Sequence, residues 1–146
     1  MSTTDSSPAT TVTSWMSSAL PLPPGAADLS RNSGLEAMAS LGQGRLLVIA
    51  EGAGGADDHP AWIGGQSGWQ RLTFVPASGF KPTAAARHPD GDVLVVERAV
   101  NLLGFFSAHL VRIDASHIKA GNRLQGRVVA VFREPLTVDN FEGIAV

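Results

Sequence analysis

Two glutamates, Glu36 and Glu142, stand at matching positions in two similar stretches, Gly34-Leu35-Glu36-Ala37 and Asn140-Phe141-Glu142-Gly143. Carboxylates that converge on one point repel each other unless a cation is bound between them. Calcium suits such a site because it takes roughly six to eight oxygen ligands from carboxylates, carbonyls and water. A bound cation can hold and polarise a phosphate and activate a water molecule for attack. We therefore predict that Glu36 and Glu142 are catalytic residues that also bind the metal.

Two more acidic residues complete the predicted calcium site. Asp139 lies close to Glu142 in the sequence, and Glu97 stands at the end of an apolar run. The second copy of the stretch has Thr83 where the others have glutamate, so the ring of acidic side chains is incomplete. The alternative is that these residues accept hydrogen bonds from backbone N–H groups and hold loops in place.

Two basic residues, Lys81 and Arg98, are predicted to bind the substrate, a small phosphorylated molecule. Arginine offers paired donors to phosphate oxygens, and lysine adds a compact point charge. Arg98 directly follows Glu97, so the alternative is that these two side chains pair with each other or with solvent.

All of these residues belong to a module that is written twice in full and begins a third time. Its first two copies carry the turns Gln43-Gly44 and Asp90-Gly91, 47 residues apart. Such pairs permit the positive φ angles of tight hairpin turns. The third copy, residues 140–145, shows that the second is longer by 12 residues. We expect this extra length in loops at 99–107 and 114–125, the latter with a short helical turn capped by Asp114 or Ser116.

Each full copy contains four short apolar segments, which is typical of a four-stranded propeller blade. These segments are residues 35–40, 45–51, 61–63 and 69–75 in the first copy and 83–88, 92–98, 108–113 and 127–132 in the second. We predict an all-β fold: a partial β-propeller of about two four-stranded antiparallel blades plus the first strand of a third. A β-sandwich is the alternative, but it does not explain why equivalent strands recur with equivalent turns.

The composition narrows the classes of partner. The 146 residues carry a net charge of −2 with both signs scattered, so nucleic acid is not expected as a main partner. The sequence has no cysteine, and no apolar run approaches the ~20 residues needed to span a membrane. Residues 1–19 are predicted to be a disordered leader or the remnant of a preceding blade, and 20–146 the propeller domain. The open strand edges of a partial ring are expected to promote self-association.

Three motifs of the chain are similar to a known family. Residues 32–37 with 44–47 resemble the start of a blade in the phytase-like propeller family, whose label is "esterase-like activity of phytase". Residues 79–83 with 89–92 and 97–98 resemble its next blade, and residues 135–146 resemble its most specific motif. This resemblance covers about residues 20–146. It implies a propeller, an exported bacterial protein that is periplasmic or secreted, and metal-assisted hydrolysis of phosphoesters.

Three functions remain open from the sequence. The first is a calcium-assisted phosphoesterase, the second a non-catalytic propeller that binds a ligand or protein, and the third a lactonase-type propeller. Fold alone does not separate them. A serine esterase has no local support, because Gly65-Gln66-Ser67-Gly68 does not match the G-x-S-x-G pattern. Because the third copy breaks off at Val146, we expect these residues to hold only part of the site and to be inactive alone.

Overall fold

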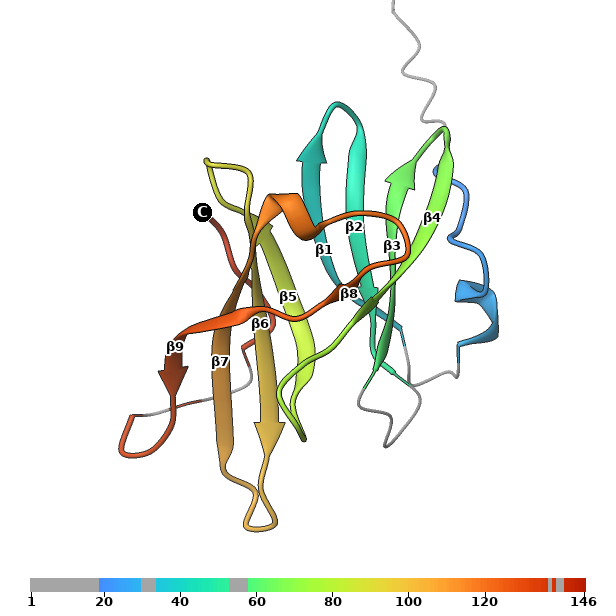
Figure 1. Ribbon diagram of the computed structural model, residues 1–146. Coiled ribbons are helices and arrows are strands. Elements are labelled where there is room, and N and C mark those ends of the chain that lie inside the picture. The colour runs from blue at the N-terminus through green and yellow to red at the C-terminus, as the bar shows by residue number, and fades with distance from the viewer. Residues whose placement is uncertain (1–18, 30–33, 53–57, 137, 139–140) are drawn as a thin grey trace, which may run out of the picture.

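The computed structural model describes residues 19–29, 34–52, 58–136, 138 and 141–146. Nearly all regular structure in this part of the chain is β-strand, and the strands form two curled sheets (Figure 1). Neither of the two short helices is long and apolar enough to cross a membrane within the described residues. The predicted all-β class is therefore confirmed.

Each sheet is built on a four-stranded antiparallel meander. The first blade consists of β1 (Leu35–Gly42), β2 (Arg45–Ala50), β3 (His59–Gly65) and β4 (Gly68–Phe74). The second consists of β5 (Lys81–Arg87), β6 (Val93–Val100), β7 (Phe106–Ile113) and β9 (Arg127–Phe132). These strands coincide with the eight predicted segments to within a few residues at each end. The partial propeller with two complete blades is confirmed.

The hairpin turns have the backbone angles that their residues permit. Gln43 and Gly44 both have positive φ, 54° and 70°, as a two-residue type I′ turn requires. The second hairpin differs, because only Gly91 adopts positive φ there, at 101°. Its N–H donates to the carbonyl oxygen of His88 at 2.9 Å, which closes a β-turn one residue earlier. The longer second turn contains Asp90, which accepts the N–H of Asp92 and pairs with Arg112.

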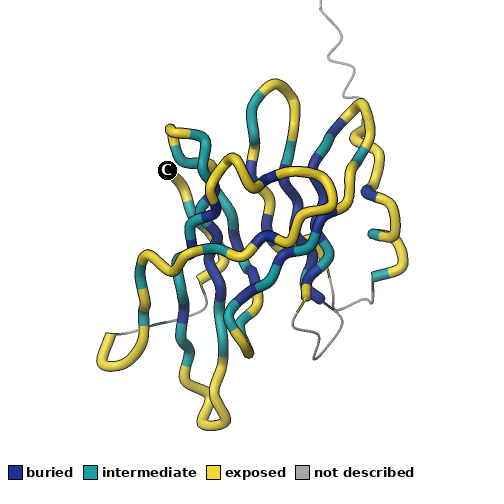
Figure 2. The backbone as a smooth tube through the Cα atoms, viewed as in Figure 1, coloured by how far each residue is buried: buried dark blue, intermediate teal, exposed yellow. Residues whose placement is uncertain are grey.

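The hydrophobic core lies between the two blades. The blades meet along their inner strands β1 and β5. The core cluster also contains Leu47 and Ile49 of β2 and Val93 and Val95 of β6. All four are fully buried, and each contributes about 1.5–3 kcal/mol by leaving water. Figure 2 shows buried stretches along the central strands of both blades. The packing of one blade on the next is thus the main source of stability.

The extra length of the second copy forms a bridge between the blades. It lies between β7 and β9 and contains the 3-10 helix η2 (Ala115–His117) and the short strand β8 (Arg123–Leu124), which pairs in parallel with β4. The predicted helical turn is confirmed, with Asp114 as its N-cap residue, although the Asp114 side chain makes no capping bond. The expected insertion at 99–107 is wrong, since the loop 101–105 is shorter than the equivalent loop 51–58.

The N-terminal and C-terminal segments of the described chain both pack on the blades. The 3-10 helix η1 (Ala26–Asp28) follows Pro21, whose carbonyl oxygen accepts the indole N–H of Trp69 at 2.7 Å. Residues 141–146 contain no strand, so the described chain has an irregular segment where the first strand of a third blade was predicted. There the carbonyl oxygen of Phe141 accepts the Thr83 hydroxyl at 2.8 Å, and its ring lies 5.8 Å from that of Phe132.

Candidate functional site

Four of the predicted site residues gather at one end of the blades. Strands β1 and β5 begin there, and the antiparallel strands β2 and β6 run toward it. We call this the open end, and the opposite end, which carries the β1–β2 and β5–β6 hairpins, the hairpin end (Figure 1). Glu36 and Lys81 lie at the starts of β1 and β5, whereas Glu97 and Arg98 lie in the last half of β6.

The repeat positions Glu36 and Thr83 share an unusual backbone feature. Each falls where the register of the inner strand shifts against its partner, between Leu35 and Ala37 in β1 and between Pro82 and Ala84 in β5. A β-bulge of this kind inserts an unpaired residue and redirects its side chain. The Glu36 carboxylate lies back toward Gly34, where a Cβ atom would come within 3.0 Å of its Oε1. The sequence equivalence of Glu36 and Thr83 is therefore also a structural equivalence.

The basic residues Lys81 and Arg98 lie side by side. They are directly paired across β5 and β6, so two cations stand next to each other at the open end. Lys81 forms an ion pair with Glu51, which follows β2 of the first blade. The Arg98 guanidinium lies 5.6 Å from the centre of the Phe106 ring. This arrangement can present donors to a phosphate, with the Lys81 ammonium in competition between that phosphate and Glu51.

Glu97 is buried in the face that the second blade turns toward the first. Its exposed fraction is 1%, and it lies on the same side of β6 as Val93 and Val95. The backbone N–H of Ala77 donates to its Oε2 atom at 3.2 Å. Burial raises the pKa of Glu97 to about 7, against the smaller opposing effect of that hydrogen bond. The alternative that Glu97 pairs with Arg98 or with solvent is therefore wrong.

A histidine that the sequence did not single out faces Glu97. His109, its cross-strand partner on β7, places Nδ1 3.9 Å from the Glu97 carboxylate. This nitrogen is buried without a hydrogen-bond partner among the described residues, and burial lowers the pKa of His109. The Phe80 ring stacks on the imidazole at 3.9 Å between centroids. No spacing pattern predicts this cluster, because its members come from three separate segments.

A second histidine near the open end is also buried. The glycine-rich stretch that contains residues 57–59 predicts a solvated loop, yet His59 begins β3 and is 2% exposed. Its Nδ1 atom lies 2.7 Å from the N–H of Gly52 and 3.1 Å from the carbonyl oxygen of Ala50. Asp58 forms a two-bonded ion pair with Arg123 of the insertion, at 2.5 and 2.8 Å. Residue 57 lies outside the described part of the chain.

The predicted metal ligands are not gathered into one cluster in the described part of the chain. Glu36 and Glu142 are exposed, whereas Glu97 is buried between the blades. Asp139 lies outside the described residues. Among the residues that are described, no group of three or more histidine, aspartate or glutamate side chains could hold a metal ion. Exposed carboxylates such as Glu36 and Glu142 have the donor chemistry that calcium prefers, while a protonated Glu97 does not.

Comparisons with known proteins agree with the repeat and its motifs. A family model described as "Phytase-like: Esterase-like activity of phytase" matches residues 10–146. The match begins inside the segment predicted as a leader and includes both blades, the insertion and the C-terminal motif. No curated protein and no solved structure matches the chain.

Proposed function

The chain belongs to the phytase-like family, and on that basis we propose that its open end contributes to a site for calcium-assisted hydrolysis of phosphoesters. The observation that carries this proposal is the direct pairing of Lys81 with Arg98 across β5 and β6. Adjacent cations held on paired strands are preorganised for a doubly charged phosphate, because strand positions vary less than loop positions.

The two basic side chains have different parts in this proposal. Arg98 binds two phosphate oxygens through its planar guanidinium, which the Phe106 ring supports on one side. Lys81 binds a third oxygen after leaving Glu51, the carboxylate with which it is paired in the free protein. Glu51 thereby loses its ion pair beside another anion, which offsets part of the affinity that Lys81 contributes.

The proposed calcium ligands are Glu36, Asp139 and Glu142. Glu36 projects from the bulge at the start of β1, and the hydrogen bond from Thr83 to Phe141 holds the residue before Glu142 beside β5. Calcium bound there would supply a Lewis acid for the phosphate and a site for an attacking water. We exclude Glu97 from the ligands, because its raised pKa leaves much of it protonated at neutral pH and its carboxyl group faces the core.

The test combines binding and turnover in the same protein. Calcium and p-nitrophenyl phosphate are titrated into the chain, and release of p-nitrophenol is followed with and without calcium. Arg98→Gln should weaken binding of the phosphoester by about tenfold or more, the usual effect of losing a charged hydrogen bond. Arg71→Gln, an exposed arginine of β4, is the matched control and should have no effect. Equal binding by wild type and Arg98→Gln would overturn the assignment.

A non-catalytic binding module is the second candidate. The outer strand β9 leaves one edge of the second sheet unpaired within the described chain, with Val129 and Val131 41% and 48% exposed. An exposed apolar edge strand is a ready site for adding a strand from another chain, including another copy of this one. Binding of p-nitrophenyl phosphate that Arg98→Gln leaves unchanged, together with concentration-dependent association that Val131→Lys abolishes, would favour this candidate over the hydrolase.

A further inference from the structure

A pocket of about 240 Å³ lies at the hairpin end, at the opposite end of the blades from Lys81 and Arg98. Its lining includes the apolar residues Leu41 and, from the insertion, Ile118, which is 8% exposed. Its charged lining residues are Arg45 from the first blade and Arg87 and Asp90 from the second blade. The pocket therefore combines apolar residues with charged side chains that can bind an ion.

The Arg87 guanidinium is held between the two hairpin tips. A Cβ atom on Gly42 would lie 3.4 Å from its Nη1, and a Cβ atom on Gly91 would lie 3.7 Å from its Nη2. Both glycines have positive φ, 84° and 101°, so other residues would be strained at either position. The two glycine turns thus leave space for the guanidinium. Arg45 begins β2 directly after the tight Gln43-Gly44 turn, which fixes its backbone as well.

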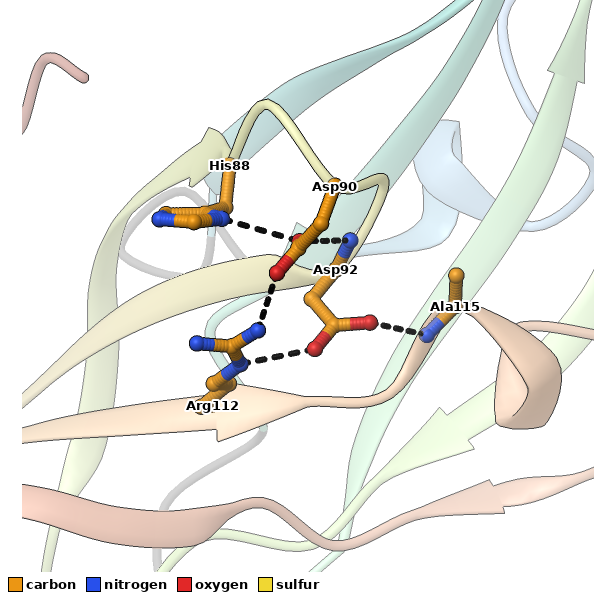
Figure 3. Close-up of polar contacts among 5 residues, drawn as sticks. All are labelled: His88, Asp90, Asp92, Arg112 and Ala115. Atoms are coloured by element: carbon orange, nitrogen blue, oxygen red, sulfur yellow. Dashed lines mark hydrogen bonds and ion pairs between the residues drawn. The ribbon is translucent and has the colours of Figure 1, made fainter.

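Asp90 forms no ion pair with either arginine among the described residues, because other partners occupy its carboxylate (Figure 3). Its Oδ1 atom accepts the N–H of Asp92 at 3.1 Å and lies 2.9 Å from His88 Nδ1. Its Oδ2 atom is paired with Arg112. The bond from the Asp92 N–H, followed by the one from His88, lowers the pKa of Asp90. The carboxylate stays ionised and is held by its own network.

The same network fixes the wall of the pocket to the insertion. Asp92 accepts a bond from Arg112 Nε at 2.7 Å and another from the N–H of Ala115 at 2.8 Å (Figure 3). The bond from Ala115, with the one from Arg112, lowers the pKa of Asp92. Asp90 and Asp92 together balance Arg112 and leave one further negative charge. The hairpin and η2 are therefore joined into one rigid wall.

The arginines of the pocket lack such partners. No ion pair or side-chain hydrogen bond joins Arg45 or Arg87 to any residue in the described ranges. Two guanidinium groups from adjacent blades thus face one small pocket, while its carboxylate is already engaged. We propose that this pocket binds a small oxyanion of the phosphate class, with Arg45 donating to it from the first blade and Arg87 from the second. Paired guanidinium groups suit a tetrahedral dianion, which offers each of them two oxygens.

This site is independent of the proposed hydrolase site, because it lies at the other end of the blades. Inorganic phosphate is titrated into the chain at constant ionic strength, and amide signals are followed by two-dimensional NMR. We expect saturable shifts of the Gly42, Gly44 and Gly91 amides. Arg87→Gln and Arg45→Gln should each weaken this binding about tenfold or more. Both side chains are exposed, so the variants should keep the unfolding midpoint of the wild type.

Two control variants separate the two ends of the molecule. Lys81→Gln and Arg98→Gln remove the cations of the open end and should leave the shifts at the hairpin end unchanged. If these variants abolish the shifts while Arg45→Gln and Arg87→Gln do not, the pocket assignment is overturned. Acetate that binds as tightly as phosphate would overturn the assigned ligand class. Absence of saturable shifts in the wild type would overturn the site itself.

Discussion

Glu97 gives the sharpest test of the packing between the blades. In the folded chain the residue is 1% exposed, and burial raises its pKa from 4.5 to about 7. In the unfolded chain Glu97 ionises near pH 4.5. Between pH 4.5 and about 7, Glu97 therefore keeps a proton in the folded state that it has lost in the unfolded state. Glu97→Gln keeps an oxygen that can accept the Ala77 N–H but removes the ionisation.

The sign and size of the effect follow from proton linkage. Because the folded pKa is raised, the stability linked to protonated Glu97 is fully present below pH 4.5 and is lost as the pH rises to about 7. Each pKa unit corresponds to about 1.4 kcal/mol, so the loss amounts to about 3 kcal/mol. The Glu97→Gln variant has no carboxyl group to ionise at this position, so it does not undergo this loss of stability. Its free energy of unfolding, relative to wild type, should therefore rise by about 3 kcal/mol between pH 4.5 and pH 8.

Urea unfolding followed by tryptophan fluorescence at several pH values provides the measurement. His59 and His109 also have pKa values lowered by burial, so they destabilise the folded chain as the pH falls below 6.5. The contribution of His59 cancels in the difference between variant and wild type, because both chains contain it. His109 lies 3.9 Å from Glu97, so the same comparison is made in a His109→Asn background. Parallel pH profiles for the two chains would refute the reasoning, because they would mean that Glu97 ionises normally in the folded state.

Two further predictions concern the backbone and the bridge. Leu124→Ala in β8 removes a fully buried side chain, so the free energy of unfolding should fall by about 2–5 kcal/mol in urea titrations. The same change at Leu103, which is 81% exposed, should cost less than about 0.5 kcal/mol, and equal losses would contradict the bridge. Gly64→Ala would place a Cβ atom 2.0 Å from the carbonyl oxygen of Gly68, so a loss of about 3 kcal/mol or more is expected. Gly143, with nothing within 4 Å, is its control, and a thermal melt that shows no difference between the two would count against the β3–β4 geometry.

The strands were predictable because their determinants are local. A run such as Val93–Val96 is apolar on both faces, and turn residues such as Gln43-Gly44 permit positive φ wherever the chain places them. The repeat then added information that a single copy lacks, since equivalent strands must form equivalent blades. The sequence also predicted that Glu36 and Thr83 occupy equivalent positions. It did not predict that both positions are β-bulges.

The environment of each polar side chain was less predictable, because it depends on which distant segment packs against it. Glu97 and Arg98 are neighbours in the sequence, yet the alternation of β6 sends one into the core and leaves the other half-buried beside Phe106. The repeat lengths were enough to locate the insertion approximately. They did not predict that its strand β8 pairs with β4, because parallel pairing between strands that are distant in the sequence leaves no local pattern.

The sequence by itself determined the class of fold, the blade boundaries and the family, since short-range periodicity and repeated motifs encode all three. The tertiary structure decided the environment of the charged side chains. It buried Glu97 against His109, set Lys81 beside Arg98, and left Arg45 and Arg87 facing one pocket. Ionisation and charge pairing depend on distances of a few ångströms between segments that are far apart in the chain, and such distances exist only once the two blades have packed.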